Sequence, residues 1–127
     1  MATSDDDGGK LNLIFVYNAD SGPINAIKDY FHKIFKPSTY DCNLCAVTFG
    51  NLGMKKSWKE FIGELECNVK FLHRDEFKEE YPGVEAHFPS AFKLANEKPE
   101  TFITMEEMNQ VASVEELIAL VREKFET

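Results

Sequence analysis

One pair of cysteines has a spacing that protein chemistry often uses, Cys42-Asn43-Leu44-Cys45. Two cysteines separated by two residues can close a redox-active disulfide or supply half of a zinc site. Cys67 begins a later apolar segment, and His32 lies near the end of a predicted helix. Cys42 and Cys45 are predicted at the start of a second strand and Cys67 at the start of a third. All four side chains would then gather at the amino-terminal edge of a parallel sheet.

Three interpretations of the cysteines stay open at this point. Cys45 and Cys67 can be small buried apolar residues with Cys42 exposed in a loop, which predicts that Cys42 reacts fastest with thiol reagents. Cys42 and Cys45 can instead form a disulfide oxidoreductase or redox-sensor pair, although no helix N-terminus is expected there to stabilise a thiolate. The third interpretation is a zinc site built from Cys42, Cys45, Cys67 and His32.

A second group of polar residues is predicted at the carboxyl-terminal edge of the strands, where open α/β sheets generally bind ligands. These candidate ligand-binding residues are Asn18, Asp20, Ser21, Gly22, His73, Arg74, His87 and Pro89. Free backbone amides at a helix start, together with His and Arg side chains, could bind a small polar or anionic group. The alternative is that Asp20 only caps the helix and Arg74 only pairs with Asp75 at the surface.

Several function classes lack their sequence signals. The chain contains neither G-x-x-x-x-G-K-[ST] nor G-x-G-x-x-G, so a P-loop and a dinucleotide site are not expected, and no cofactor is predicted. A net charge of −8 and a pI near 4.9 argue against nucleic acid or an anionic membrane as partner. The remaining partners are an unknown protein or a small polar ligand. Three cysteines, an odd number, and the lack of an apolar membrane span favour a cytoplasmic location.

The pattern along the chain predicts an acidic disordered tail over residues 1–10 and a single domain over residues 11–127. Leu11–Tyr17 is a nearly continuous apolar run, typical of a central strand buried on both faces. A polar turn follows, and then an amphipathic helix that begins at Pro23 and ends before Pro37.

The rest of the chain continues the alternation of strands and helices. The further elements that we predict are a strand at Cys45–Phe49, a helix opened by a capping box at Ser57, a strand ending at His73, a helical turn at Asp75–Tyr81, strands at Ala91–Leu94 and Thr101–Met105 around a turn containing Pro99, and a helix opened by a capping box at Ser113 with Phe125 on its inner face. The fold class is therefore α/β: a two-layer or three-layer sandwich whose mixed sheet combines parallel strands with a C-terminal antiparallel hairpin.

The domain resembles the thioredoxin-like fold superfamily in three places. These are the strand–turn–helix of residues 11–35 with its turn Asp20-Ser21-Gly22-Pro23, the segment His87-Phe88-Pro89-Ser90-Ala91-Phe92-Lys93, and the hairpin and last helix of residues 90–125. The resemblance implies that Pro89 is cis and faces the functional edge.

The chain departs from the superfamily at two points. The turn after the first strand lacks the cysteine pair, so the resemblance implies a redox-silent binding or interaction domain, with the redox pair Cys42/Cys45 and the zinc site as alternatives. In addition, the family places one strand and one helix between the first helix and the proline, and this chain is predicted to have a further strand.

Overall fold

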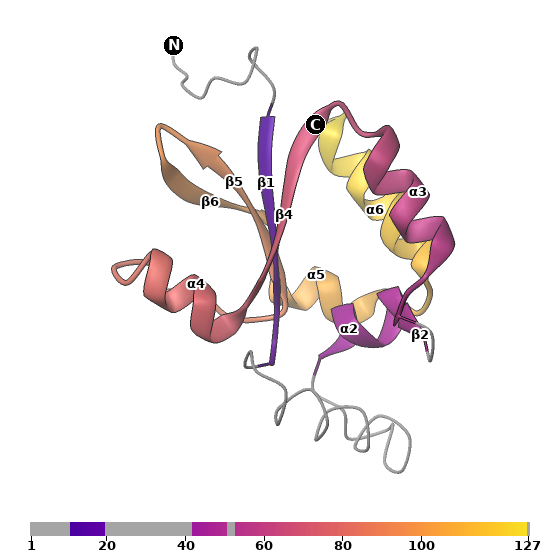
Figure 1. The fold of residues 1–127 in the computed structure, drawn as a ribbon, viewed down its shortest axis with the longest axis horizontal. Coiled ribbons are helices and arrows are strands. Elements are labelled where there is room, and N and C mark those ends of the chain that lie inside the picture. Colours follow the sequence, from indigo (N-terminus) through magenta and orange to yellow (C-terminus); the bar gives the residue numbers. More distant parts are fainter. Residues whose placement is uncertain (1–10, 20–41, 51–52, 127) are drawn as a thin grey trace.

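The computed structural model describes residues 11–19, 42–50 and 53–126. Its centre is a four-stranded mixed sheet in the order β4-β1-β5-β6 (Figure 1). The strands are β1 (Leu11–Tyr17), β4 (Cys67–His73), β5 (Ser90–Ala95) and β6 (Lys98–Ile103). β1 runs parallel to β4 and antiparallel to β5, and β5 runs antiparallel to β6. The predicted α/β class with a mixed sheet and a closing hairpin is confirmed.

β1 is the central strand, and its side chains alternate between two apolar cores. Leu13, Phe15 and Tyr17 belong to one core, and Ile14 and Val16 belong to the other. All five side chains are buried, as predicted for a strand covered on both faces. The first core includes side chains of α3 (Lys56–Glu64) and α6 (Val114–Phe125), and the second includes Phe77 of α4 (Arg74–Glu80). Helices therefore cover both faces of the sheet (Figure 1).

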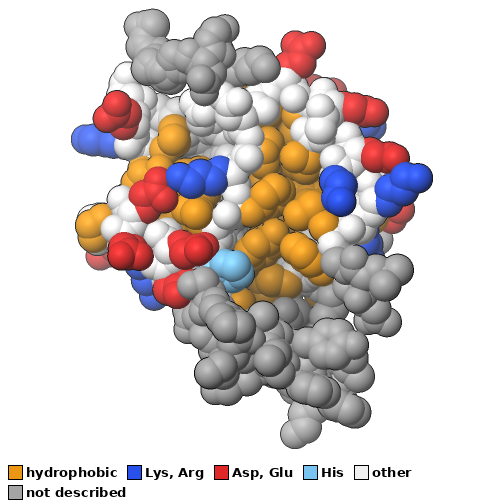
Figure 2. All heavy atoms as spheres, viewed as in Figure 1, with side chains coloured by type: hydrophobic (Ala, Val, Ile, Leu, Met, Phe, Trp, Pro, Cys, Tyr) orange, Lys and Arg blue, Asp and Glu red, His pale blue; other side chains and the backbone are white. Residues whose placement is uncertain are grey.

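β4 lies at one edge of the sheet. Figure 2 shows hydrophobic side chains reaching the surface in the middle of the viewed face, where β4 and α3 lie. The half-buried apolar residues of these two elements are Ile62 of α3 and Cys67, Val69 and Phe71 of β4, and Leu65 directly follows α3. Among the described residues, no helix is long and apolar enough to cross a membrane.

Two predicted segments have a different structure. The predicted strand Cys45–Phe49 is wrong, because residues Asn43–Thr48 form the helix α2. Only Phe49–Gly50 (β2) is extended, and it pairs with Gly53–Met54 (β3) in a separate small hairpin. Val47 and Thr48 favour strands by propensity, but α2 buries Leu44, Val47 and Thr48, and this packing overrides the local preference.

The C-terminal hairpin also differs from its predicted boundaries. Asn96 and Glu97 form its two-residue turn with positive φ angles of 55° and 67°, the backbone of a type I′ turn. Pro99, predicted in the turn, lies inside β6, where an edge strand tolerates the missing N–H. The second strand ends at Ile103 because the Thr104 hydroxyl accepts the N–H of Glu107 at 3.1 Å and starts α5 (Met105–Gln110), a helix that we did not predict.

One predicted helix cap is confirmed and the other is wrong. The Ser113 hydroxyl accepts the backbone N–H of Glu116 at 3.2 Å and caps α6. The helix α3, in contrast, begins at Lys56, and its N-cap is Lys55, two residues before the predicted cap Ser57, with no capping side chain. Phe125, predicted on the inner face of α6, is 40% exposed. The predicted tail (1–10) and first helix (23–36) lie outside the described residues.

This difference between the two serines gives a matched test. The variant Ser113→Ala is expected to lower the free energy of unfolding by about 1 kcal/mol, because the α6 N-terminus loses its hydroxyl acceptor. Ser57→Ala is expected to change it by less than about 0.5 kcal/mol, since Ser57 is exposed and caps nothing. Urea denaturation followed by circular dichroism measures both values. Equal losses would contradict the observed start of α3.

Candidate functional site

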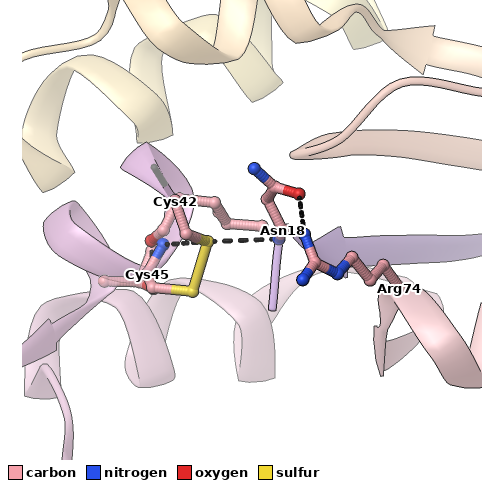
Figure 3. Close-up of a disulfide and its surroundings, with 6 residues drawn as sticks. Asn18, Cys42, Cys45 and Arg74 are labelled. Carbon is pink, nitrogen blue, oxygen red and sulfur yellow. Dashed lines mark hydrogen bonds between the residues drawn. A yellow bond between two sulfur atoms is a disulfide. The ribbon is translucent and has the colours of Figure 1, made fainter. Parts of the chain in front are cut away.

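The cysteine pair lies at the carboxyl end of the central strand. Cys42 and Cys45 form a disulfide, with their Cα atoms 5.3 Å apart (Figure 3). The Cys42 sulfur accepts two backbone hydrogen bonds, from the N–H of Asn18 at 3.3 Å and from the N–H of Cys45 at 3.3 Å. Asn18 directly follows β1, so these bonds tie the start of α2 to the end of the sheet's central strand.

The helix α2 is held in place from several directions. The side-chain amide of Asn43 donates hydrogen bonds to the carbonyl oxygens of Met108 at 2.9 Å and Val111 at 2.8 Å, at the end of α5. Leu44 is fully buried in the core, and the hydroxyl of Thr48 donates to its carbonyl at 2.6 Å. The burial of Leu44 and the hydrogen bonds of Asn43 fix the position of α2. The position of the disulfide at the start of this helix is fixed with it.

Asn18 connects the cysteine pair to Arg74. Its side-chain oxygen accepts a hydrogen bond from Nη1 of Arg74 at 3.0 Å, while its backbone N–H donates to Cys42 (Figure 3). The backbone N–H of Arg74 donates to the carbonyl of Ala19 at 3.1 Å. Asn18 and Arg74 are thus in direct contact. Both were predicted at this edge of the sheet because each follows the end of a parallel strand.

His73 and Tyr17 lie on the same edge. They are register partners at the ends of β4 and β1, and their rings are 5.5 Å apart. The backbone N–H of His73 donates to the Glu76 carboxylate at 2.7 Å, and this hydrogen bond is the main reason why the pKa of Glu76 is lowered. Burial raises the pKa of Tyr17 above its ordinary value, so Tyr17 stays neutral at physiological pH.

Pro89 also lies beside this edge. The residue after it, Ser90, pairs with Val16 of β1, which places Pro89 next to the carboxyl end of the central strand. The Phe88–Pro89 peptide bond is cis, as the resemblance implies. His87, two residues earlier, is exposed and lines a surface cavity formed with β5 and β6. Asp20, Ser21 and Gly22 lie outside the described residues.

The structure overturns the predicted positions of the cysteines. Cys42 is 1% exposed and Cys45 is half-buried, whereas the opposite order was expected. Cys67 pairs with Leu11 at the other end of the parallel strands, so it does not meet Cys42 and Cys45. The remaining predicted zinc ligand, His32, is outside the described residues, and the described residues contain no group of three or more His, Cys, Asp or Glu that could hold a metal ion.

The error came from the segment that carries the pair. A strand at Cys45–Phe49 would have started at the amino-terminal edge, while the helix α2 starts at the carboxyl-terminal edge, next to Asn18. Sequence reasoning also missed Tyr17 and Glu76 as neighbours of His73. The Glu76 contact had a detectable signal, because Glu is typical of the third position of a helix that follows a strand end. The chain matches none of the protein-family models, curated proteins or solved structures with which it was compared.

Proposed function

We propose that this chain is a thioredoxin-like domain that performs thiol–disulfide exchange through Cys42 and Cys45. The observation that carries the proposal is the pair of backbone N–H groups, from Asn18 and Cys45, that donate to the Cys42 sulfur. When the disulfide opens, hydrogen bonds to this sulfur stabilise negative charge on it, and a stabilised thiolate is a good leaving group.

Three observations support the thioredoxin-like part of the proposal. The sheet order β4-β1-β5-β6 combines one parallel pair with an antiparallel hairpin. Pro89 lies at the edge that also holds the cysteine pair. Because Cys45–Phe49 is not a strand of this sheet, β4 is the one strand of the four-stranded sheet that lies between the predicted first helix and Pro89 among the described residues. The helices α2 and α3 and the small hairpin β2–β3 still set the chain apart from the superfamily in this interval.

The difference in exposure between the two cysteines sets the direction of the exchange. An incoming thiolate attacks the sulfur of Cys45, which is the more exposed residue, and forms a new S–S bond with it. The electron pair of the old bond leaves with the Cys42 sulfur as a thiolate, whose negative charge the N–H groups of Asn18 and Cys45 stabilise by hydrogen bonds. The second thiolate of the same dithiol reductant then attacks the reductant's own sulfur in the mixed disulfide. A disulfide forms within the reductant, and Cys45 leaves as a thiolate. The reductant is oxidised to a disulfide and the protein is reduced to a dithiol; the reverse sequence oxidises a substrate dithiol.

The test is a redox titration of the full chain. We expect one two-electron transition between about −180 and −280 mV in glutathione buffers, as in other exchange proteins. Mass spectrometry after acid quenching and alkylation should count three thiols in the reduced chain and one in the oxidised chain. Cys67→Ser is the control and should keep the transition, because Cys67 lies at the opposite end of β4.

Two outcomes would overturn the proposal. A disulfide that stays oxidised below about −300 mV and does not exchange with glutathione would make the bridge structural and favour the redox-silent binding domain. Stoichiometric zinc in the purified chain, with Cys42 and Cys45 both resistant to oxidation, would favour the metal site. The cytoplasmic location remains part of the proposal, because disulfides in reducing compartments are mostly transient and catalytic or sensing.

A further inference from the structure

We propose that a small cavity on the α4 side of the sheet binds the ammonium group of a compact amine. The cavity has a volume of about 170 Å³ and lies between residues 85–87 and the junction of β6 with α5. The lining residues that enter the argument are Glu85, Ser90, Phe92, Thr101 and Glu106, and His87 also lines the cavity. Ser90 and Phe92 belong to the face of β5 that packs toward α4, whereas Cys42 belongs to the core on the other face, so this site is separate from the disulfide.

Ser90 supplies the polar atom that points to a ligand. It is 2% exposed, and its hydroxyl has no hydrogen-bond partner among the described residues. Ser90 cannot move away from this position, because it pairs with Val16 of the central strand. Buried hydroxyl groups in folded proteins are nearly always hydrogen-bonded, so an unpaired one that lines a cavity indicates a partner supplied from outside the chain.

The charges around the cavity indicate which partner. Glu85 and Glu106 both line it, both are exposed, and neither takes part in an ion pair among the described residues. No Lys or Arg is among its lining residues. Two carboxylates and a hydroxyl are all hydrogen-bond acceptors, which suits a group with several N–H donors and a positive charge. An ammonium group has this character, and an anion does not.

The size and the apolar wall limit the rest of the ligand. A volume of about 170 Å³ holds about five water-sized groups. Phe92 forms part of the wall, so the cavity offers apolar contact to a short alkyl chain. A butylammonium-like group fits both limits. It can come from a free alkyl amine or from a lysine side chain of a peptide, and these two sources have the same chemistry at the site.

The experiment compares three ligands of similar shape by NMR titration of the full chain. Butylammonium is expected to cause saturable shifts in the amide signals of Ser90, Thr101 and Glu106. Butanol, which lacks the charge, should bind at least about tenfold more weakly, and butyrate should not bind. A lysine-containing tripeptide with blocked ends, titrated in parallel, distinguishes the sources: tighter binding than butylammonium indicates a peptide, and weaker binding indicates a free amine.

Matched variants connect the binding to these residues. Glu106 and Glu115 occupy the same second position of α5 and α6, and both are exposed. Glu106→Gln is expected to raise the dissociation constant of butylammonium about tenfold, while Glu115→Gln, with the same charge change, should leave it unaltered. Ser90→Ala should raise it at least about threefold. Similar shifts with all three ligands, no saturation below about 100 mM, or equal effects of the two glutamate variants would overturn the proposal.

Discussion

The variant Phe15→Ala is expected to lower the free energy of unfolding by about 4 kcal/mol, a large part of the stability of a domain of this size. Phe15 is fully buried in the middle of β1. Its ring centroid lies 5.4 Å from that of Trp58 and 5.6 Å from that of Phe71. Truncation removes these contacts and leaves a cavity that α3 and β4 cannot fill without moving. Urea denaturation followed by circular dichroism measures the loss.

Phe125→Ala is the control for this variant. The residue type and the change are the same, but Phe125 is 40% exposed, and its ring lies against that of Phe102 with the centroids 5.3 Å apart. Its loss is expected to stay below about 1 kcal/mol. If both variants lost the same amount, Phe15 would not occupy the centre of the core, and the position of β1 in the middle of the sheet would have to be abandoned.

The second large effect concerns the two sulfurs of the disulfide. In a Cys67→Ser background, the reduced variant Cys42→Ser keeps only Cys45, and Cys45→Ser keeps only Cys42. We expect Cys45 to react with iodoacetamide at least about tenfold faster than Cys42. Cys42 is 1% exposed and becomes accessible only when the structure opens locally, and each 1.4 kcal/mol of opening free energy slows labelling tenfold.

The comparison has an internal control. In concentrated urea both single-cysteine chains are unfolded, so their labelling rates should become nearly equal. The sequence alone predicted the opposite order, with Cys42 exposed in a loop. Faster labelling of Cys42 in the folded chain would therefore support that earlier interpretation, and it would remove the direction of attack on which the proposed exchange mechanism depends.

Much of the sheet could be predicted because its signals are local. Leu11–Tyr17 is apolar at nearly every position, and a strand without a polar face is stable only between two covered faces. Ser113 three residues before Glu116 marks a helix start by itself, because the hydrogen bonds involved join residues of one turn. The Ser113 hydroxyl accepts the N–H of Glu116, and the Glu116 carboxylate accepts the N–H of Ala112. The placement of Asn18 near Arg74 followed from strand order, because parallel strands end at the same edge of a sheet.

The cysteine site depended on contacts that no local pattern contains. Residues Asn43–Thr48 carry no strong helix signal, and Val47 and Thr48 favour a strand. They become helical because the helix buries Leu44 and because the side-chain amide of Asn43 donates hydrogen bonds to two carbonyls at the end of α5. These carbonyls lie more than sixty residues away in the chain. A helix in place of a strand moves the pair from one edge of the sheet to the other.

The sequence by itself therefore determined the class of the fold, the central strand and the last helix, whose hydrogen bonds and apolar periods act over a few residues. The tertiary structure alone decided where Cys42 and Cys45 lie, which of them is exposed, and that Ser90 is buried without a partner among the described residues. These properties depend on packing between segments far apart in the chain. The free energy of such contacts exceeds the small differences in propensity that distinguish a helix from a strand in a short segment.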